Sequence, residues 1–412
     1  MSLPGTEASP LVVKPTGKNR DDEKGQATVL ETILNLCKTC CGTGCLALPY
    51  ATQSGGVFVF GIGLLFLGLW NLYAVERLVR CRTYLVEVIR LLDEEEEQEE
   101  TQIRMTATGE MESSSAPKRM KFPKESTSTL GKVAFFAFGP AGLEVMDILM
   151  TILLLGIVIS YLSAVISFLS DTPLTIGPVG DALVIASLMA ILSLVPDMGH
   201  LSGISGAGLL VLAGAFVVIA GYGFCSFLQA PDVSLPVWPA SAVGLSHFFG
   251  VCVFGFGGKV TTRIETNPTS RTSLTLYSIC PTIVVPLTYN FQESMKKPAL
   301  IIPTTAGALG CVALFYIILG VGLSILYPNV TGEILHELPG TGWLPTFVQV
   351  LAFVGCACVG FVSFCVPPIL HIRIVWMLKE DTRPPSGVLF LDVVMLVWGL
   401  IATTVGTIYT LG

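Results

Sequence analysis

Charge is what this sequence has least of. Only 13% of its 412 residues are charged, and the mean hydropathy is +0.73. Soluble globular chains carry about 25% charged residues, so the composition excludes an ordinary soluble domain. A bilayer core needs about 20 consecutive apolar residues for each helix that crosses it. Stretches near that length number about nine, at residues 27–51, 57–79, 137–170, 179–196, 201–228, 246–291, 299–326, 345–371 and 388–411.

Motifs for nucleotide chemistry are also missing. No G-x-x-x-x-G-K-[ST] loop occurs, so nothing supports an ATP-driven pump. No hydrolase or kinase motif is present, and we expect neither enzyme activity nor a cofactor or metal. The net charge of −7 comes mostly from the acidic run at 93–100 and gives no basis for a nucleic-acid partner. The first 25 residues are polar, unlike a cleavable signal peptide, so we expect the first span to direct insertion.

Lysine and arginine are absent from four predicted loops, at 52–56, 171–178, 229–244 and 327–344. All but four of the 23 basic residues fall before the first span or in the alternate loops. Because cytoplasmic loops are enriched in lysine and arginine, we expect the N-terminus to be cytoplasmic. Asn329 begins a glycosylation sequon on the opposite, non-cytoplasmic side, so we expect it to carry a glycan.

The chain divides into two unequal parts by composition. Residues 1–25 form a polar cytoplasmic tail, and residues 26–412 form one transmembrane domain. Within that domain, residues 93–128 combine an acidic run, a Ser/Thr/Met stretch and a basic patch. This composition predicts a disordered cytoplasmic loop, which either serves as a solvated linker or binds a regulatory partner.

The first span contains helix breakers at its centre. Gly42, Thr43 and Gly44 lie at mid-span, and Pro49 follows within two turns. An unwound centre would free N–H groups that attract a carboxylate and carbonyls that attract an ammonium group or a cation. Discontinuous helices of transporters bind zwitterions in this way. The alternative is a patch of small residues that packs against another helix.

Cysteines 37, 40 and 41 form a C-x-x-C-C cluster in the same span. Such a cluster is typical either of a metal or redox site or of small apolar residues that pack in a membrane helix. No histidine lies nearby in the sequence, and we therefore favour packing.

Three motifs resemble the amino acid/auxin permease family, nearest its proton-coupled amino acid transporter branch. They are GTGCLALPYA at 42–51, FFGVCVFGFGG at 248–258 and QESMKKP at 292–298. The resemblance implies an all-α integral membrane protein with a leucine-transporter-type inverted-repeat bundle. It also implies secondary active transport of amino acids by alternating access, coupled to protons or sodium, or passive. The family has eleven spans, and about nine are recognised here.

The same resemblance implies a substrate site where the first and sixth spans are broken. The substrate carboxylate would meet backbone N–H groups of Thr43, Gly44 and Cys45. The ammonium group would meet carbonyls of Cys40, Cys41 and Phe254. The implied substrate-binding residues are Cys40, Cys41, Gly42, Thr43, Gly44, Cys45, Phe254 and Phe256.

The sequence departs from the family pattern in three places. A polar block at 259–281 splits the sixth-span motif, and it either loops out of the hydrocarbon, lines a wet cavity or comes from a retained intron. The family's eighth helix, which supplies a sodium ligand, is not recognised, so sodium coupling is less favoured than proton coupling. Gly257 stands where the proton-coupled branch often has a glutamate, so that carboxylate cannot carry a proton here.

Ionisable residues inside spans are candidates for coupling or gating. Lys38 lies one turn before the break and either gates the site or extends to the cytoplasmic interface. Glu144 and Asp147 share one helix face and either relay protons or mark the membrane boundary. Tyr161 either lines the cavity or packs inside the bundle.

The expected function is therefore amino acid transport in the plasma membrane or in a vacuolar or lysosomal membrane, with the lipid bilayer as surroundings. Two alternatives stay open. One is a transporter-like sensor that binds an amino acid without moving it. The other is a non-functional variant, because one motif is split and two spans are missing.

Overall fold

The computed structural model describes residues 27–106, 129–170, 176–193, 198–229, 235–262, 278–283, 294–327, 351–378 and 380–411, with residues 289, 291, 292 and 330. Almost all of these residues are helical. The α-helices are α1 (Val29–Cys40), α2 (Leu48–Gly55), α3 (Val57–Thr106), α4 (Thr129–Phe138), α5 (Pro140–Ser170), α6 (Pro178–Ser193), α7 (Met198–Gln229), α8 (Ala242–Gly255), α10 (Ile301–Leu326), α12 (Val366–Met377) and α13 (Ser386–Leu411). The shorter elements are the 3-10 helices η1 (Thr43–Ala47), η3 (Pro298–Leu300) and η6 (Glu380–Thr382), the π-helix η5 (Gly355–Cys365), and the strands β1 (Gly257–Thr262) and β2 (Ser278–Ile283).

The predicted all-α membrane fold is confirmed. Five helical stretches are long and apolar enough to cross a membrane within the described part of the chain. They are Val57–Leu85, Pro140–Ser163, Pro298–Leu326, Leu351–Met377 and Ser386–Thr410. Two shorter apolar helical stretches, Ala213–Gln229 and Ala242–Gly255, add to them. The inverted repeat and a total of about nine spans stay predictions.

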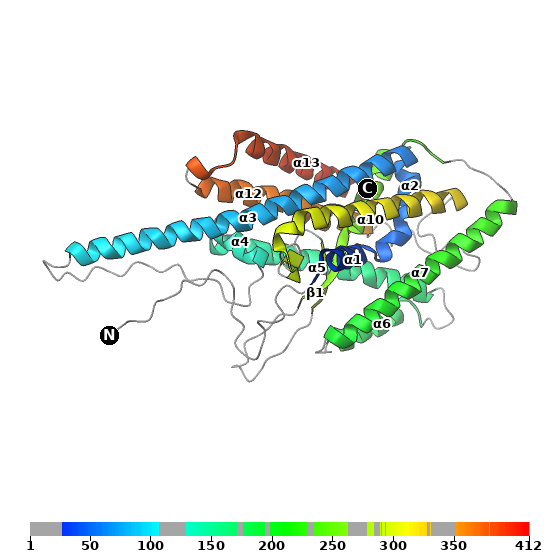
Figure 1. Ribbon diagram of the computed structural model, residues 1–412. Helices are drawn as coiled ribbons and strands as arrows, with labels where there is room; N and C mark the ends of the chain where they lie inside the picture. The colour runs from blue at the N-terminus through cyan, green and yellow to red at the C-terminus, as the bar shows by residue number, and fades with distance from the viewer. Residues whose placement is uncertain are drawn as a thin grey trace.

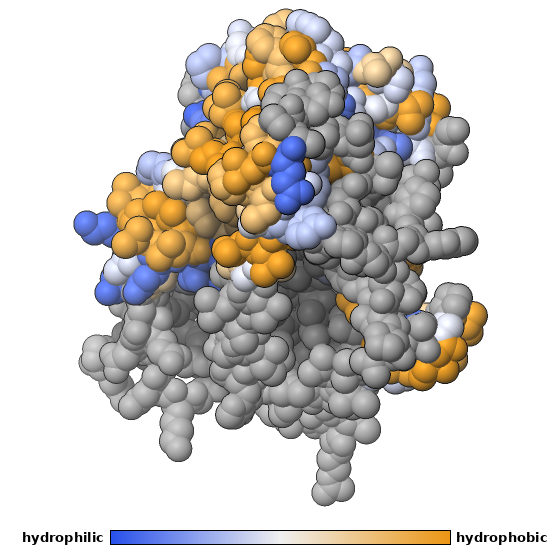
Figure 2. All heavy atoms as spheres, turned by 90° about the vertical axis from the view of Figure 1, so that its right-hand side faces the viewer, coloured by the Kyte–Doolittle hydropathy of each residue, from blue (hydrophilic) through white to orange (hydrophobic). Residues whose placement is uncertain are grey.

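Large apolar side chains cover much of the outer surface. Phe390, Trp398 and Ile408 of α13 are 70%, 57% and 62% exposed. Figure 2 shows such hydrophobic residues gathered over the described part of the face in view. Apolar surface of this extent is incompatible with water and matches the lipid-facing side of a membrane bundle.

Helix α3 corrects the prediction of disorder after residue 92. The helix continues through the acidic run to Thr106, so residues 93–106 are helical rather than a loop. Glutamate, glutamine, arginine and leucine all have high helix propensity, and they extend a helix that the bundle has already nucleated. In Figure 1 this end of α3 projects beyond the other helices. Residues 107–128 lie outside the described part.

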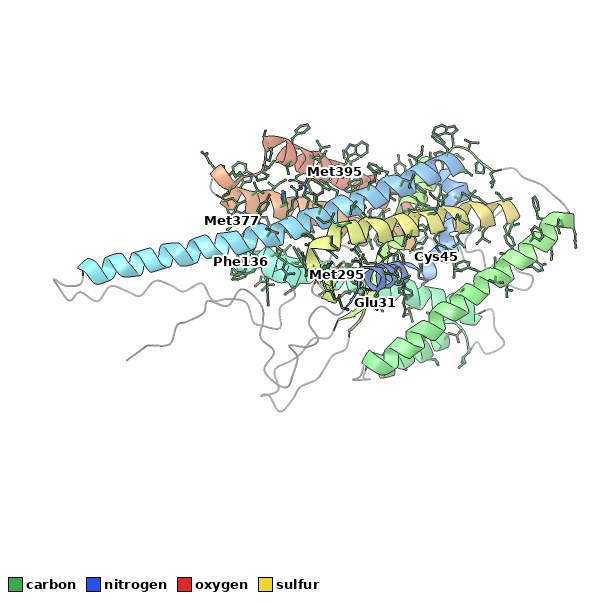
Figure 3. The ribbon with its side chains drawn as sticks, viewed as in Figure 1. Glu31, Cys45, Phe136, Met295, Met377 and Met395 are labelled. Carbon is green, nitrogen blue, oxygen red and sulfur yellow. The ribbon has the colours of Figure 1, made fainter. Side chains whose placement is uncertain are left out.

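Helices far apart in the sequence pack around the broken first helix (Figure 1). Helix α10 contacts α1, α2 and α3, while α8 contacts α2, η5 and α13. The approach of α8 to η5 is the closest of these, because a Cβ built on Gly355 would lie 1.9 Å from the carbonyl oxygen of Gly250. Figure 3 labels Phe136 of α4 and Met395 of α13, which pack against the outside of this core.

A two-stranded antiparallel ribbon follows α8 directly. Strand β1 pairs with β2 from Gly257 opposite Ile283 to Thr262 opposite Ser278. The polar block predicted at 259–281 therefore leaves the helix and forms a hairpin whose strands contact α1 and α5. The middle of that block, residues 263–277, lies outside the described residues.

Candidate functional site

The first span is broken where the glycines predict it. Helix α1 ends at Cys40, and Cys41 and Gly42 have extended backbones, with φ of −70° and −132°. The tighter helix η1 then begins at Thr43 and is followed by α2. A helix that stops inside the bundle leaves its last carbonyls free, and a helix that starts there leaves its first N–H groups free. Both kinds of group meet within a few residues here.

Part of this polar backbone is already bonded. The N–H of Cys45 donates to the Gly42 carbonyl at 3.1 Å, which makes it the first hydrogen bond of η1. The N–H groups of Thr43 and Gly44 precede that bond and have no partner within η1. In this conformation the carboxylate site is therefore narrower than predicted, because Cys45 contributes no free N–H.

The end of α8 lies against the break. A Cβ built on Gly44 would lie 3.3 Å from Cδ1 of Phe254 and 3.7 Å from Cα of Gly255. Only a glycine allows so close an approach without displacement of the Phe254 ring. The structure therefore brings together the two motifs that the sequence analysis paired, although about 200 residues separate them.

Tyr316 of α10 joins the two helix ends. Its hydroxyl lies 2.8 Å from the carbonyl oxygen of Cys40 and 2.6 Å from that of Gly255, and its side chain is fully buried. One hydroxyl hydrogen thus serves two carbonyls that the helix breaks leave free. Sequence analysis missed this residue. The available signal was a tyrosine in an otherwise apolar span, since a buried tyrosine hydroxyl needs a partner.

Aromatic rings form one wall of the site. The ring centroids of Tyr161 and Phe254 lie 6.4 Å apart, and those of Phe256 and Tyr316 lie 5.8 Å apart. Phe254 and Phe256 are buried, and Tyr161 is half-buried. The structure thus places Tyr161 beside the predicted pocket residues, as one of its two interpretations requires.

Of the other coupling candidates, Glu144 and Asp147 lie away from the break, and Lys38 lies close to it. Glu144 and Asp147 are exposed near the start of α5, and Asp147 precedes Tyr161 by about 20 Å along the helix axis. Lys38 is half-buried in the last turn of α1, one turn before the break. Asn329, the predicted glycosylation site, lies outside the described residues.

The cysteines of the first span are unpaired. Cys37, Cys40, Cys41 and Cys45 are all free thiols, and the Cys37 thiol contacts the Ala308 carbonyl of α10 at 3.7 Å. Among the described residues, no group of three metal-ligating side chains forms a metal site. The packing interpretation agrees with this arrangement. In Figure 3 Cys45 marks the position of the break within the bundle.

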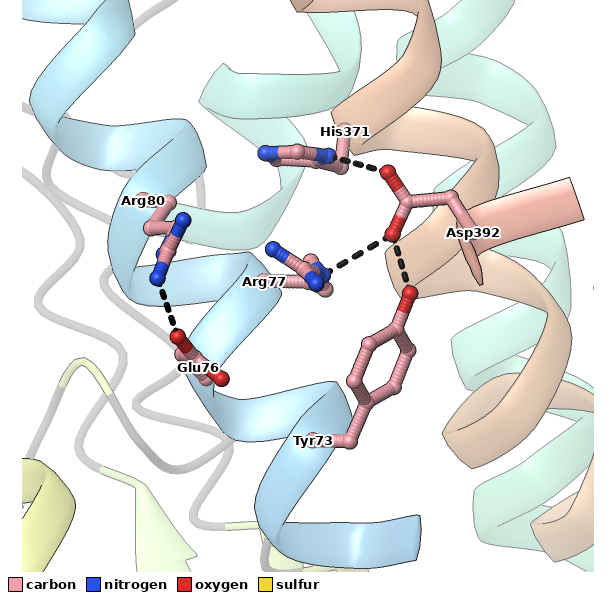
Figure 4. Close-up of polar contacts among 6 residues, drawn as sticks. All are labelled: Tyr73, Glu76, Arg77, Arg80, His371 and Asp392. Carbon is pink, nitrogen blue, oxygen red and sulfur yellow. Dashed lines mark hydrogen bonds and ion pairs between the residues drawn. The ribbon is translucent and has the colours of Figure 1, made fainter. Parts of the chain in front are cut away.

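A second polar cluster is buried between α3, α12 and α13 (Figure 4). Asp392 lies 2.8 Å from Arg77 Nε and 2.6 Å from His371 Nδ1, and it accepts a hydrogen bond from the Tyr73 hydroxyl. Sequence analysis counted Arg77 with the basic residues of a cytoplasmic loop, whereas the structure buries it with 4% exposure. The cluster's partners come from separate helices, so no local pattern indicates it.

Comparison with known proteins agrees with this geometry. A family model described as "Transmembrane amino acid transporter protein" matches residues 25–100 and 117–285, which include the break and α8. No solved structure matches the chain. The family consists of carriers rather than enzymes, with amino acids as substrates and the lipid bilayer as surroundings. The protein is therefore a multi-pass integral membrane protein that belongs to the transmembrane amino acid transporter family.

Proposed function

We propose that this protein carries amino acids by alternating access, with the substrate bound at the break between α1 and η1. The observation that carries the proposal is the meeting of that break with the end of α8 at Gly44 and Phe254. A zwitterion needs hydrogen-bond donors for its carboxylate and acceptors for its ammonium group, and two interrupted helices present both.

The two ends of the substrate would meet different groups. The N–H groups of Thr43 and Gly44 at the start of η1 suit the carboxylate, and the helix dipole adds to the attraction. The carbonyls of Cys40 and Gly255 suit the ammonium group, and the Tyr316 hydroxyl occupies them in this conformation. Tyr316 thus satisfies both carbonyls in this conformation, and an arriving ammonium group would replace it.

The close walls favour a small substrate. Gly44 contacts Phe254, and Tyr161 approaches the same ring from α5. These contacts leave little room between the break and α8, so we expect small side chains to be accepted before aromatic ones.

Protons remain the favoured coupling ion over sodium. The distribution of lysine and arginine supports a cytoplasmic N-terminus.

Uptake by purified protein tests the proposal. Proteoliposomes would be supplied with radiolabelled glycine, alanine, proline and phenylalanine, and accumulation would be compared with protein-free vesicles. Time-dependent uptake of the small amino acids is expected. Saturable binding of the same amino acids in detergent, with no uptake above protein-free vesicles, would contradict transport and favour a sensor.

Substitution of Tyr316 by phenylalanine removes one hydroxyl from this site. The variant keeps the ring but leaves the Cys40 and Gly255 carbonyls unpaired in an apolar interior, which costs about 1–3 kcal/mol. Because an arriving ammonium group would satisfy the same carbonyls, the penalty falls on the state without substrate, so we expect alanine to bind about ten- to hundredfold more tightly. The measurement is the alanine concentration for half-maximal uptake together with the melting temperature in detergent.

Tyr409, 43% exposed on α13, supplies the matched control. Tyr409→Phe removes the same hydroxyl from a lipid-facing position and should leave uptake and melting temperature unchanged. Equal uptake and equal melting temperature of the two variants would show that Tyr316 takes no part in substrate binding.

The β1–β2 ribbon favours a second candidate function, a sensor that binds without transporting. The paired strands begin one residue after Phe256 and hold the end of α8, a segment that must move during alternating access. A carrier whose helix is held in this way would bind its ligand and remain in one state.

Removal of the ribbon separates the two functions. Gly258 and Thr282 are direct partners across the ribbon, so their Cα atoms lie about 5 Å apart. A peptide bond joins Cα atoms 3.8 Å apart, so deletion of residues 259–281 leaves ends that can be joined with little movement. We expect the deletion variant to fold and to transport at least as fast as the full chain. Loss of the monodisperse, heat-stable protein on deletion would show that the ribbon is part of the fold.

A further inference from the structure

The unsatisfied buried polar atoms of the described residues all fall on one interface. They are Trp70 Nε1, Arg77 Nη1, Ser363 Oγ and His371 Nε2, whereas Arg77 Nε faces Asp392 at 2.8 Å. The first two side chains belong to α3, and the other two belong to η5 and α12, which pack against α3. We call this set the polar seam. Buried polar groups normally have partners, so a row of unpaired ones indicates a place for water or protons.

At one end of the polar seam, Arg77 and Asp392 form an ion pair, and His371 keeps one nitrogen without a partner among the described residues. Asp392 is fully buried. It accepts hydrogen bonds from the Tyr73 hydroxyl and the His371 Nδ1–H, and it forms an ion pair with the Arg77 guanidinium. The Arg77 guanidinium faces one of the Asp392 oxygens at 2.8 Å and would balance the charge of a carboxylate there. His371 donates through Nδ1, so its neutral ring keeps a lone pair on Nε2. That lone pair has no partner among the described residues, and the ring is fully buried.

We propose that His371 is a proton-binding residue of this carrier. A proton from the aqueous side would bond to Nε2, and the neutral imidazole would become an imidazolium. The charge of the cluster would change from zero to +1, while Arg77 and Asp392 stay an ion pair. Release of the same proton on the other side would restore the neutral ring. The proposal rests on the transport function proposed above.

An imidazolium at His371 would carry a second N–H, at Nε2, and in this conformation that donor has no acceptor among the described residues. A conformation that admits water to the polar seam would supply one. Proton binding therefore has a different free energy in the two conformations, which is the condition for coupling a proton to a conformational change.

The surroundings of His371 contain few other titratable groups. Helix α3 contributes Tyr73, Arg77, Cys81 and Tyr84. The ring centroid of Tyr84 lies 5.8 Å from that of His371. Helix α13 contributes Asp392, α4 has the single charged residue Lys132, and η5 has only thiols. On α12 itself, Arg373 bonds to the Ala137 carbonyl of α4. His371 supplies the imidazole of this group, and its Nε2 has no partner among the described residues.

The polar seam approaches α8, which carries residues of the substrate site. The ring centroid of Trp70 lies 4.3 Å from that of Phe364, and the Phe364 centroid lies 6.3 Å from that of Phe249 on α8. Arg77 follows Trp70 by seven residues on the same face of α3, about 10 Å further along the axis. His371 lies six residues before the end of its apolar span, so it is nearer one membrane surface than the break is. A proton site in this position adjoins the substrate site without overlapping it.

Nitrogen-15 NMR of histidine tests proton binding without any substrate. The full chain has four histidines, so comparison of the wild type with His371→Gln assigns the His371 ring in liposomes of phosphatidylcholine and phosphatidylglycerol. Over a titration from alkaline to acid buffer, we expect the neutral ring with its proton on Nδ1 to be replaced by an imidazolium. A ring that keeps one protonation state across that range, or that carries its neutral proton on Nε2, would overturn the proposal.

Proton movement provides the second readout. Proteoliposomes that contain a trapped pH-sensitive dye would be given alanine, and proton entry would be compared with exchange of labelled alanine at equal pH. His371→Gln should lose alanine-driven proton entry and keep exchange, because exchange needs no net proton movement. Arg80→Gln, at a half-exposed pair with Glu76, should keep both.

The outcomes separate the two proposals. Unchanged proton entry in His371→Gln would overturn the proton site while leaving transport intact. Equal loss of entry and exchange in this variant, with no titration of the wild-type ring, would assign His371 a structural role and also overturn it. Absence of both activities in the wild type would refute the proposed transport of alanine, and the NMR titration would still decide the proton site.

Discussion

Replacement of Arg77 by glutamine is expected to lower the free energy of unfolding by about 3–5 kcal/mol. The variant leaves the Asp392 carboxylate fully buried between α3, α12 and α13 with no cation beside it. In this conformation the carboxylate is fully buried, so no solvent replaces the guanidinium and most of the desolvation penalty remains. The measurement is the midpoint of unfolding as the protein is titrated from a mild detergent into sodium dodecyl sulfate.

Arg80 gives a matched control on the same helix. Its pair with Glu76 is 40% and 30% exposed, and exposed ion pairs contribute only about 0–1 kcal/mol. Arg80→Gln should therefore shift the midpoint little. A loss in Arg77→Gln as small as the loss in Arg80→Gln would show that the buried pair does not stabilise the bundle.

A double variant identifies the cause of the loss. Arg77→Gln combined with Asp392→Asn removes both charges and leaves neutral groups of similar size. Because the unpaired carboxylate is then absent, most of the lost stability should return. A double variant no more stable than Arg77→Gln alone would attribute the loss to packing of the arginine stem against Tyr73, over whose ring the guanidinium lies at 4.5 Å.

Replacement of Gly355 by alanine is the second change with a large expected effect. A Cβ at this position would lie 1.9 Å from the carbonyl oxygen of Gly250, a backbone atom that cannot rotate away. Helix α8 and η5 would have to separate, and overpacking of this kind costs about 1–3 kcal/mol or more. Because α8 carries Phe254, uptake should fall together with melting temperature.

Gly310 serves as the control for this prediction. It lies on α10 with nothing within 4 Å of its Cβ position, so Gly310→Ala should be neutral or gain up to about 1 kcal/mol of helix propensity. If Gly355→Ala also behaves in this way, the two helices do not approach as closely as the structure indicates.

Local features of the chain were predictable because they depend on neighbouring residues. The break at Gly42–Gly44 follows from the low helix propensity of glycine, and the structure ends α1 just before it. Five of the apolar stretches correspond to helices long and apolar enough to cross a membrane, since the bilayer fixes the length each needs. The extension of α3 to Thr106 was missed, because acidic composition suits both a disordered loop and an exposed helix.

Contacts between distant helices were not predictable. Tyr316 bonds to the carbonyls of Cys40 and Gly255, which lie 276 and 61 residues away. Asp392 meets Arg77 across more than 300 residues, and each looks unremarkable in its own helix. A single sequence carries no record of which helix faces which, and one polar residue in a span indicates a partner without identifying it.

The amino-acid sequence by itself determined that this protein is helical, that it is an integral membrane protein and that its first span is broken. Hydrophobic length and glycine content act locally, so no tertiary information is needed for them. Only the tertiary structure decided that Tyr316 closes the two helix ends and that His371, Asp392 and Arg77 share one buried site. Those choices depend on how helices pack, because a buried polar group is satisfied by whichever element packing brings beside it.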